Sequence, residues 1–290
     1  MNAAVSWRQL WNDTAALRGR AEARWLCEEA SGNFGEEFAD VLDTPASIHS
    51  VAHLDAMLAR LQTGEPLQYV LGHWSFRRLD LLVDRRVLIP RPETELLTEH
   101  AIALLRQLAC ERPQRPLFVA DLGTGSGAIG LSLAAELPTD LIEVWLTDSS
   151  PDAIDVARAN TAGVGMAGAR VRFGLGSWFS ALPQSLRGDL ALVVSNPPYI
   201  GRDDGRVAAI VRDWEPHTAL YADDDGLADL RQIVEGAVEW LMPGGWLVLE
   251  IDSSQGSAVI DLMTAAGLDL VAIRRDFADR DRIAVGRRVP

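Results

Sequence analysis

From Leu117 to the C-terminus, short apolar segments alternate with longer segments whose apolar residues recur at helical spacing. Five of the apolar segments predict buried strands: Leu117–Leu122, Glu143–Thr147, Val171–Gly174, Leu190–Ser195 and Trp246–Ile251. The last stretch of the chain predicts two more strands. Strands that alternate with helices form a mostly parallel sheet with helices on both faces. We therefore expect an α/β fold built on a seven-stranded sheet.

The chain before this region has a different pattern. Residues 1–72 contain helical segments such as Ala15–Glu29 and Ser50–Gln62, so we expect a small helical domain there. Within 73–92, the short runs Trp74–Phe76, Leu79–Val83 and Val87–Ile89 look like strands around Arg85-Arg86 and predict a β-hairpin linker. The remaining residues, 93–290, begin with a helix and include the whole predicted sheet.

A glycine-rich turn follows the first strand of that sheet, Asp121-Leu122-Gly123-Thr124-Gly125-Ser126-Gly127. Glycines let the backbone turn tightly and approach a ligand closely, at the sheet edge where α/β folds bind ligands. A dinucleotide prefers the spacing Gly-x-Gly-x-x-Gly. The spacing here is Gly-x-Gly-x-Gly, and Asp121 would repel a pyrophosphate but attract the ammonium and sulfonium of S-adenosylmethionine. The alternative is a tight turn that binds nothing.

Two further residues fit such a ligand. Asp148 ends the second strand, where its carboxylate can accept hydrogen bonds from both ribose hydroxyls, or can cap the next helix. Trp178 follows the third strand, where its indole can cover an adenine ring or pack in the core.

The fourth strand ends at Asn196-Pro197-Pro198-Tyr199, and we expect it to lie next to the first strand. Two consecutive prolines make a stiff loop and leave backbone carbonyls free to accept hydrogen bonds. The Asn196 side chain adds another acceptor, and Tyr199 adds a flat ring. This combination suits an NH₂ group on a planar amide or amine, whose nitrogen is held in line with an activated methyl. The structural alternative is a proline turn before a surface loop.

The composition of the chain limits which partners and which kinds of chemistry are expected. The formal net charge is −14, which argues against a protein that grips a nucleic-acid backbone. All the basic residues are arginine, so lysine Schiff bases and Walker phosphate loops are excluded. The two cysteines and five histidines show no metal-ligand pattern. No membrane span or secretory signal is visible, and we expect a cytoplasmic monomer.

At these motifs the sequence resembles class I (Rossmann-like) amino methyltransferases, and more narrowly the HemK/PrmC family. The narrower likeness rests on Ile89-Pro90-Arg91-Pro92-Glu93-Thr94-Glu95, with Gly64–Tyr69 before it and Glu215-Pro216 after the proline loop. It covers nearly the whole chain. The resemblance implies methylation of the side-chain amide nitrogen (N5) of glutamine in the Gly-Gly-Gln motif of peptide chain release factors. Residues 1–72 would then recognise the substrate, and 93–290 would be the methyltransferase domain.

The resemblance also implies residue roles. Asp121, Gly123, Thr124, Gly125, Ser126, Gly127, Asp148 and Trp178 would bind S-adenosyl-L-methionine, with a further contact from Asn196. Asn196, Pro197, Pro198 and Tyr199 would hold the glutamine amide, and Asn196, Pro197 and Tyr199 would be catalytic. Arg91 would either pair with an acid or help receive the substrate loop.

The sequence departs from the family pattern at Ser177, where many relatives carry aspartate, at Tyr221–Leu227 and at Ile251-Asp252. Two other functions stay open. An N6-adenine methyltransferase acting on DNA or RNA would share the Asn-Pro-Pro-Tyr loop, because adenine also presents a planar NH₂. A binding module without catalysis would keep the fold, although loss of the glycines or of Asn196 would be expected then.

Overall fold

The computed structural model describes residues 5–112, 116–202 and 205–290. The chain divides into two compact units, Met1–Gly72 and His73–Pro290.

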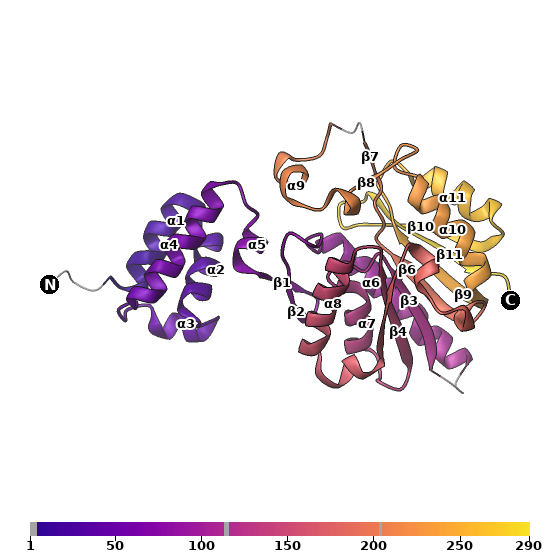
Figure 1. Ribbon diagram of the computed structural model, residues 1–290, viewed down its shortest axis with the longest axis horizontal. Coiled ribbons are helices and arrows are strands. Elements are labelled where there is room, and N and C mark those ends of the chain that lie inside the picture. Colours follow the sequence, from indigo (N-terminus) through magenta and orange to yellow (C-terminus); the bar gives the residue numbers. More distant parts are fainter. Residues whose placement is uncertain (1–4, 113–115, 203–204) are drawn as a thin grey trace. The chain divides into compact units, whose positions relative to one another are not determined.

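The first unit is helical, coloured indigo to violet in Figure 1. Its helices are α1 (Trp7–Arg18), α2 (Arg20–Ser31), α3 (Glu36–Val41), α4 (Ile48–Gln62) and α5 (Leu67–Leu71). Their apolar faces share one core around Trp7, Leu26, Leu54 and Met57. The expected helix Ala15–Glu29 is interrupted at Gly19, whose φ of 83° ends α1 and lets the chain turn into α2.

The second unit begins with a hairpin, in which β1 (His73–Phe76) pairs antiparallel with β2 (Leu79–Leu82). Its turn therefore lies at Arg77-Arg78 and not around Arg85-Arg86, and the expected strand Val87–Ile89 is irregular chain. The turn is fixed by Arg77, whose guanidinium pairs with Glu136 at 2.6 Å. At the other end, the Asn160 side chain accepts from the backbone N–H of Leu82 and donates to the Ser126 carbonyl. The hairpin is therefore bound to the segments that carry the glycine-rich turn.

The predicted seven-stranded sheet is present, in the order β10-β11-β9-β6-β3-β4-β5. β11 runs antiparallel to both of its neighbours and the other pairings are parallel. The strands are β3 (Leu117–Leu122), β4 (Ile142–Asp148), β5 (Val171–Leu175), β6 (Leu190–Ser195), β9 (Leu241–Glu250), β10 (Leu268–Arg275) and β11 (Asp281–Arg288). The mostly parallel α/β fold predicted from the sequence is confirmed.

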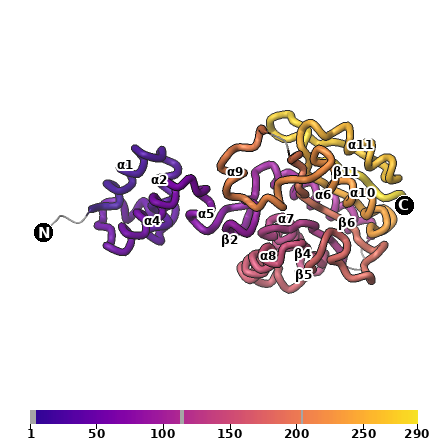
Figure 2. The backbone as a smooth tube through the Cα atoms, turned by 45° about the horizontal axis from the view of Figure 1, so that its top comes forward, coloured from indigo at the N-terminus to yellow at the C-terminus, as the bar shows by residue number. Residues whose placement is uncertain are grey.

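Helices cover both faces of this sheet (Figures 1 and 2). One apolar core lies under α6 (Pro92–Glu111), α7 (Ala128–Glu136) and α8 (Pro151–Gly163). The other lies under α10 (Ala228–Trp240) and α11 (Gly256–Ala265). Because both faces are covered, β6 is buried along its whole length, which explains its unbroken apolar sequence.

A segment between β6 and α10 was not predicted. It contains β7 (Ile200–Gly201), α9 (Ala209–Trp214), the 3₁₀ turn η4 (His217–Ala219) and β8 (Tyr221–Ala222), with β7 and β8 paired in parallel. Three other 3₁₀ helices, η1 (Gly165–Arg170), η2 (Trp178–Ala181) and η3 (Gln184–Leu186), lie before β6. Short elements of this kind carry too few apolar residues for periodicity to show them.

Candidate active site

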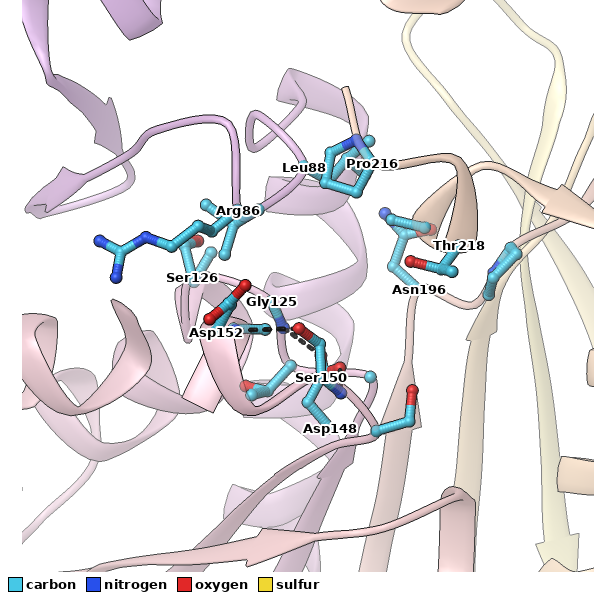
Figure 3. Close-up of a pocket in the computed structure, with 18 of the residues that line it drawn as sticks. Arg86, Leu88, Gly125, Ser126, Asp148, Ser150, Asp152, Asn196, Pro216 and Thr218 are labelled. Carbon is cyan, nitrogen blue, oxygen red and sulfur yellow. Dashed lines mark hydrogen bonds between the residues drawn. The ribbon is translucent and has the colours of Figure 1, made fainter. Parts of the chain in front are cut away.

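The glycine-rich turn joins β3 to α7 and forms one wall of a cavity of about 430 Å³ (Figure 3). Gly123, Gly125 and Gly127 all have positive φ, which disfavours any residue with a Cβ. A Cβ on Gly123 would lie 3.4 Å from the Trp178 ring, and one on Gly127 would lie 2.9 Å from Leu131. The loop therefore needs glycine both for its backbone path and for its close packing.

Asp121 lies beneath this loop and does not line the cavity. The residue is completely buried. One carboxylate oxygen accepts hydrogen bonds from the Thr124 hydroxyl at 2.6 Å and the Gly130 N–H at 3.0 Å. Burial raises the pKa of this carboxyl to about 6, against the effect of those two donors. The position differs from the one expected for direct ligand contact, because Asp121 braces the loop and the start of α7 from inside.

Asp148 ends β4 and faces the same cavity. One carboxylate oxygen accepts from the Gly125 N–H at 3.0 Å and the other from the Ser150 N–H at 2.9 Å, as Figure 3 shows. Burial raises the pKa of this carboxyl. Helix α8 is capped by Ser150 itself, so Asp148 is not the helix cap. It ties the glycine loop to the β4–α8 turn, and each oxygen keeps lone pairs for a ligand.

Trp178 covers the glycine loop from the end of β5. Its φ of 46° is unusual for a residue with a large side chain and places the indole against Gly123. The indole N–H donates to the Asp229 carboxylate, a cavity-lining residue at the start of α10. Ser177 also lines the cavity. The ring is thus partly cavity wall and partly packed against the second core.

The proline loop stands beside the glycine loop because β6 and β3 are neighbours in the sheet. Leu122 and Ser195 are register partners, and the Ser195 hydroxyl donates to the Leu122 carbonyl at 2.6 Å. Asn196 and Pro198 line the cavity, whereas Pro197 is buried. Tyr199 lines a second cavity of about 350 Å³, and its hydroxyl donates to the Glu250 carboxylate at 3.2 Å.

Several residues at the site were missed by sequence reasoning. Asp229 and the segments Arg85–Leu88 and Thr218-Ala219 line the cavity. Thr94 also lines it, and this residue lies in the Ile89–Glu95 segment on which the family resemblance rests. Glu250 is buried behind the cavity and contacts both Thr94 and Tyr199. Of these residues, only Glu250, a carboxylate in the otherwise apolar strand β9, could have been noticed in the sequence.

Arg91 pairs with an acid, which was one of its two expected roles. Its guanidinium lies 2.5 Å from one oxygen of Glu215, and the other oxygen of Glu215 accepts from the Ile89 N–H. The Arg85 guanidinium also stacks over the Trp214 ring at 4.5 Å. These contacts hold the α9 segment against the chain between β2 and α6.

Within the described residues, no helix is long and apolar enough to cross a membrane. The same residues contain no group of three or more histidines, cysteines or acids that could hold a metal ion.

Known proteins with a similar fold and sequence are methyltransferases. Residues 100–213 match the family described as the methyltransferase small domain. Among solved structures, the hMettl16 catalytic domain in complex with MAT2A 3'UTR hairpin 6 superposes with a TM-score of 0.53 at 14% identity, covering 83% of this chain and 84% of that one. A methyltransferase from Pyrococcus furiosus gives a TM-score of 0.51 at 14% identity, covering 81% of this chain and all of that one. At these identities the likeness shows the fold alone.

Sequence relatives are much closer. The release factor glutamine methyltransferase of Bordetella pertussis is 41% identical, over 92% of this chain and 94% of that protein. The Escherichia coli (strain K12) protein of the same name is 37% identical over 92% of each chain, and the one from Xylella fastidiosa (strain Temecula1) is 41% identical over 84% of each. These matches include the proline loop, the glycine loop and the strands that bring them together. The chain belongs to the release factor glutamine methyltransferase family.

Proposed function

We propose that this protein transfers a methyl group from S-adenosyl-L-methionine to the side-chain amide nitrogen (N5) of glutamine in the Gly-Gly-Gln motif of peptide chain release factors. The observation that carries the proposal is one cavity lined by both the glycine loop and Asn196. The relatives are named release factor glutamine methyltransferases, and this supports a release factor as the substrate. The proposal includes action as a monomer in the cytoplasm, without direct binding of nucleic acid.

The residues around the glycine loop fit S-adenosylmethionine. A Cβ at Gly125 would meet nothing within 4 Å, so the backbone there borders open space that a ligand can approach. Asp148 offers two carboxylate oxygens to ribose hydroxyls, and the Trp178 indole offers a face to adenine. Gly123, Thr124 and Ser126 line the intervening wall. When bound, the cofactor supplies a methyl group already activated by a sulfonium.

The proline loop then has to prepare a poor nucleophile, because the lone pair of an amide nitrogen is delocalised. Asn196 Oδ1 and the Pro197 carbonyl accept the two amide hydrogens, which draws electron density toward the nitrogen and fixes its orientation. Pro198 lines the same cavity as Asn196, and Tyr199, which lines the neighbouring cavity, is proposed to supply a flat surface next to the amide. The nitrogen loses its proton after it has gained positive charge, so no general base is needed before transfer.

The test is methyl transfer from labelled S-adenosylmethionine to a purified release factor. Label is expected in the release factor and is expected to disappear when its Gly-Gly-Gln glutamine is replaced by alanine. Adenine-containing DNA and RNA serve as parallel substrates. Label in nucleic acid and none in the release factor would overturn the proposal in favour of N6-adenine methylation.

Gly226 offers a test of the support behind the proline loop. Its φ is 87°, and a Cβ there would lie 2.1 Å from the Tyr199 carbonyl oxygen. Gly226→Ala is therefore expected to displace Tyr199, lower activity at least about tenfold and destabilise the protein by about 1–3 kcal/mol. Gly205→Ala is the control, since its Cβ would meet nothing within 4 Å. Thermal unfolding and methyl transfer are compared, and equal behaviour of the two variants would contradict the expectation.

A further inference from the structure

A chain of hydrogen bonds runs from the proline loop into the protein interior. Asn196 Nδ2 donates to Thr94 Oγ1 at 3.3 Å, and the Thr94 hydroxyl donates to Glu250 Oε2 at 2.7 Å. The Tyr199 hydroxyl donates to the other oxygen of Glu250 at 3.2 Å. Glu250 is 0% exposed, so this carboxylate has no access to bulk water. It thus connects two residues of the proline loop, one of them through Thr94.

The direction of these bonds is set by the carboxylate. An ionised carboxylate only accepts hydrogen bonds, and a threonine hydroxyl has a single hydrogen to donate. Because that hydrogen points at Glu250, Thr94 Oγ1 can act toward Asn196 only as an acceptor. The reversed amide would place Asn196 Oδ1 against the lone pairs of Thr94 Oγ1, leaving a part-buried acceptor opposite another acceptor. The bond from Nδ2 is the one that this arrangement allows.

We infer that Thr94 and Glu250 are positioning residues that fix the orientation of the Asn196 amide, so that Oδ1 is the atom presented to the substrate NH₂ group. The inference rests on the proposed function, in which Asn196 accepts a hydrogen from the substrate amide. It adds the reason that Asn196 offers an acceptor there and not its own NH₂. A reversed amide would meet the substrate NH₂ donor with a second donor.

Protonation of Glu250 should weaken the preference for this orientation of the Asn196 amide. Burial raises the pKa of Glu250 to about 7. Hydrogen bonds from Thr94 and Tyr199 and the charge of Arg282 act to lower this pKa, whereas the charge of Glu93 adds to the rise. Below that pH the neutral acid can donate to Thr94, whose own hydrogen is then free to meet Asn196 Oδ1. The folded pKa is raised, so the ordering carboxylate is present above about pH 7 and is lost as the pH falls. We expect kcat to increase with pH through this range.

Three variants separate positioning from simple structural support. Thr94→Val keeps the shape of the side chain but removes the hydroxyl, and should lower kcat about tenfold with little change in KM. Thr94→Ser restores the hydroxyl and should restore kcat. Glu250→Gln can still accept from Thr94 and donate to Tyr199 but does not titrate, so its kcat should become flat between about pH 6 and 8. Cofactor affinity, measured by calorimetry, should be unchanged in Glu250→Gln, because Glu250 does not line the cavity.

A second measurement needs no substrate. The chain has five asparagines, so asparagine-selective ¹⁵N labelling gives few side-chain NH₂ signals: Asn2, Asn12, Asn33, Asn160 and Asn196. The Asn196 signal, identified by its absence in Asn196→Ala, should shift with pH around 7 in the wild-type protein. It should stop shifting in Glu250→Gln and move to a new position in Thr94→Val.

These two readouts keep the inference distinct from the proposed function. If the wild-type protein fails to methylate release factors, the proposed substrate is wrong, while the NMR titration still tests the orientation of Asn196. A Thr94→Val variant with wild-type kcat and an unmoved Asn196 signal would overturn the positioning role. So would a Glu250→Gln variant that keeps the wild-type pH profile.

Discussion

Replacing Asn196 with alanine is expected to lower kcat for release factor methylation by about 10²–10³-fold while the protein remains folded. Loss of one preorganised hydrogen-bond partner that acts in the transition state typically has an effect of this size. Asn196 lines the cavity from the end of β6, and its backbone stays tied to the sheet through Ser195. The measurement is single-turnover methyl transfer, with circular dichroism to confirm the fold.

Two further variants sharpen this result. Asn12→Ala, an exposed position on α1, is the matched control and should retain full activity. Asn196→Asp keeps the size of the side chain and its acceptors but loses the NH₂ that donates to Thr94. It should also be impaired, because its charge is separated from the Glu250 carboxylate only by the Thr94 hydroxyl. An Asn196→Ala variant with normal transfer would show that the loop holds its substrate in some other way.

Replacing Asp148 with alanine is expected to weaken cofactor binding about 10²-fold. Hydrogen bonds to a charged group contribute about 1.5–3 kcal/mol each, and the proposed ribose contact uses this carboxylate. The variant also releases the N–H groups of Gly125 and Ser150, so the glycine loop loses a tether at the same time. Isothermal titration with S-adenosylmethionine gives the dissociation constant.

The control for this prediction is Asp155→Ala, because Asp155 is an exposed acid on α8 that does not line the cavity. Its affinity should stay within about twofold of the wild type, as an exposed charge contributes little. Asp148→Asn keeps an acceptor but not the charge, so its dissociation constant should fall between those of the wild type and Asp148→Ala. Equal dissociation constants for Asp148→Ala and wild type would remove Asp148 from the binding site.

The sheet could be predicted closely where strands are buried on both faces. Leu117–Leu122 and Leu190–Ser195 begin and end as the sequence indicated, because central parallel strands show up as unbroken apolar runs. The expected strand Trp246–Ile251 is longer in the structure, starting at Leu241. Pairing with β6 is interrupted between Leu241 and Trp246, so Pro243 and the two glycines after it form an irregularity within β9, with Gly244 at a φ of 82°.

The residues of the site could be predicted only where a sequence motif lies at the end of a predicted strand. The glycine loop and Asn196 met both conditions and line one cavity. Asp121 belongs to the same motif, but its side chain is directed into the protein and not toward the ligand side of the loop. Thr94 and Glu250 are 156 residues apart, and nothing in a single sequence indicates that such residues meet.

The pairing of β3 with β6 has a consequence for how such enzymes can change. The two loops stand on adjacent strands, which in a sheet are held about 4.8 Å apart by backbone hydrogen bonds. The separation of the two loops is thus fixed by the peptide backbone, which every sequence shares. Side chains around the rim can be exchanged during evolution without increasing that separation. One scaffold can in this way pass from an amide to a base as acceptor while the spacing of the two loops is inherited unchanged.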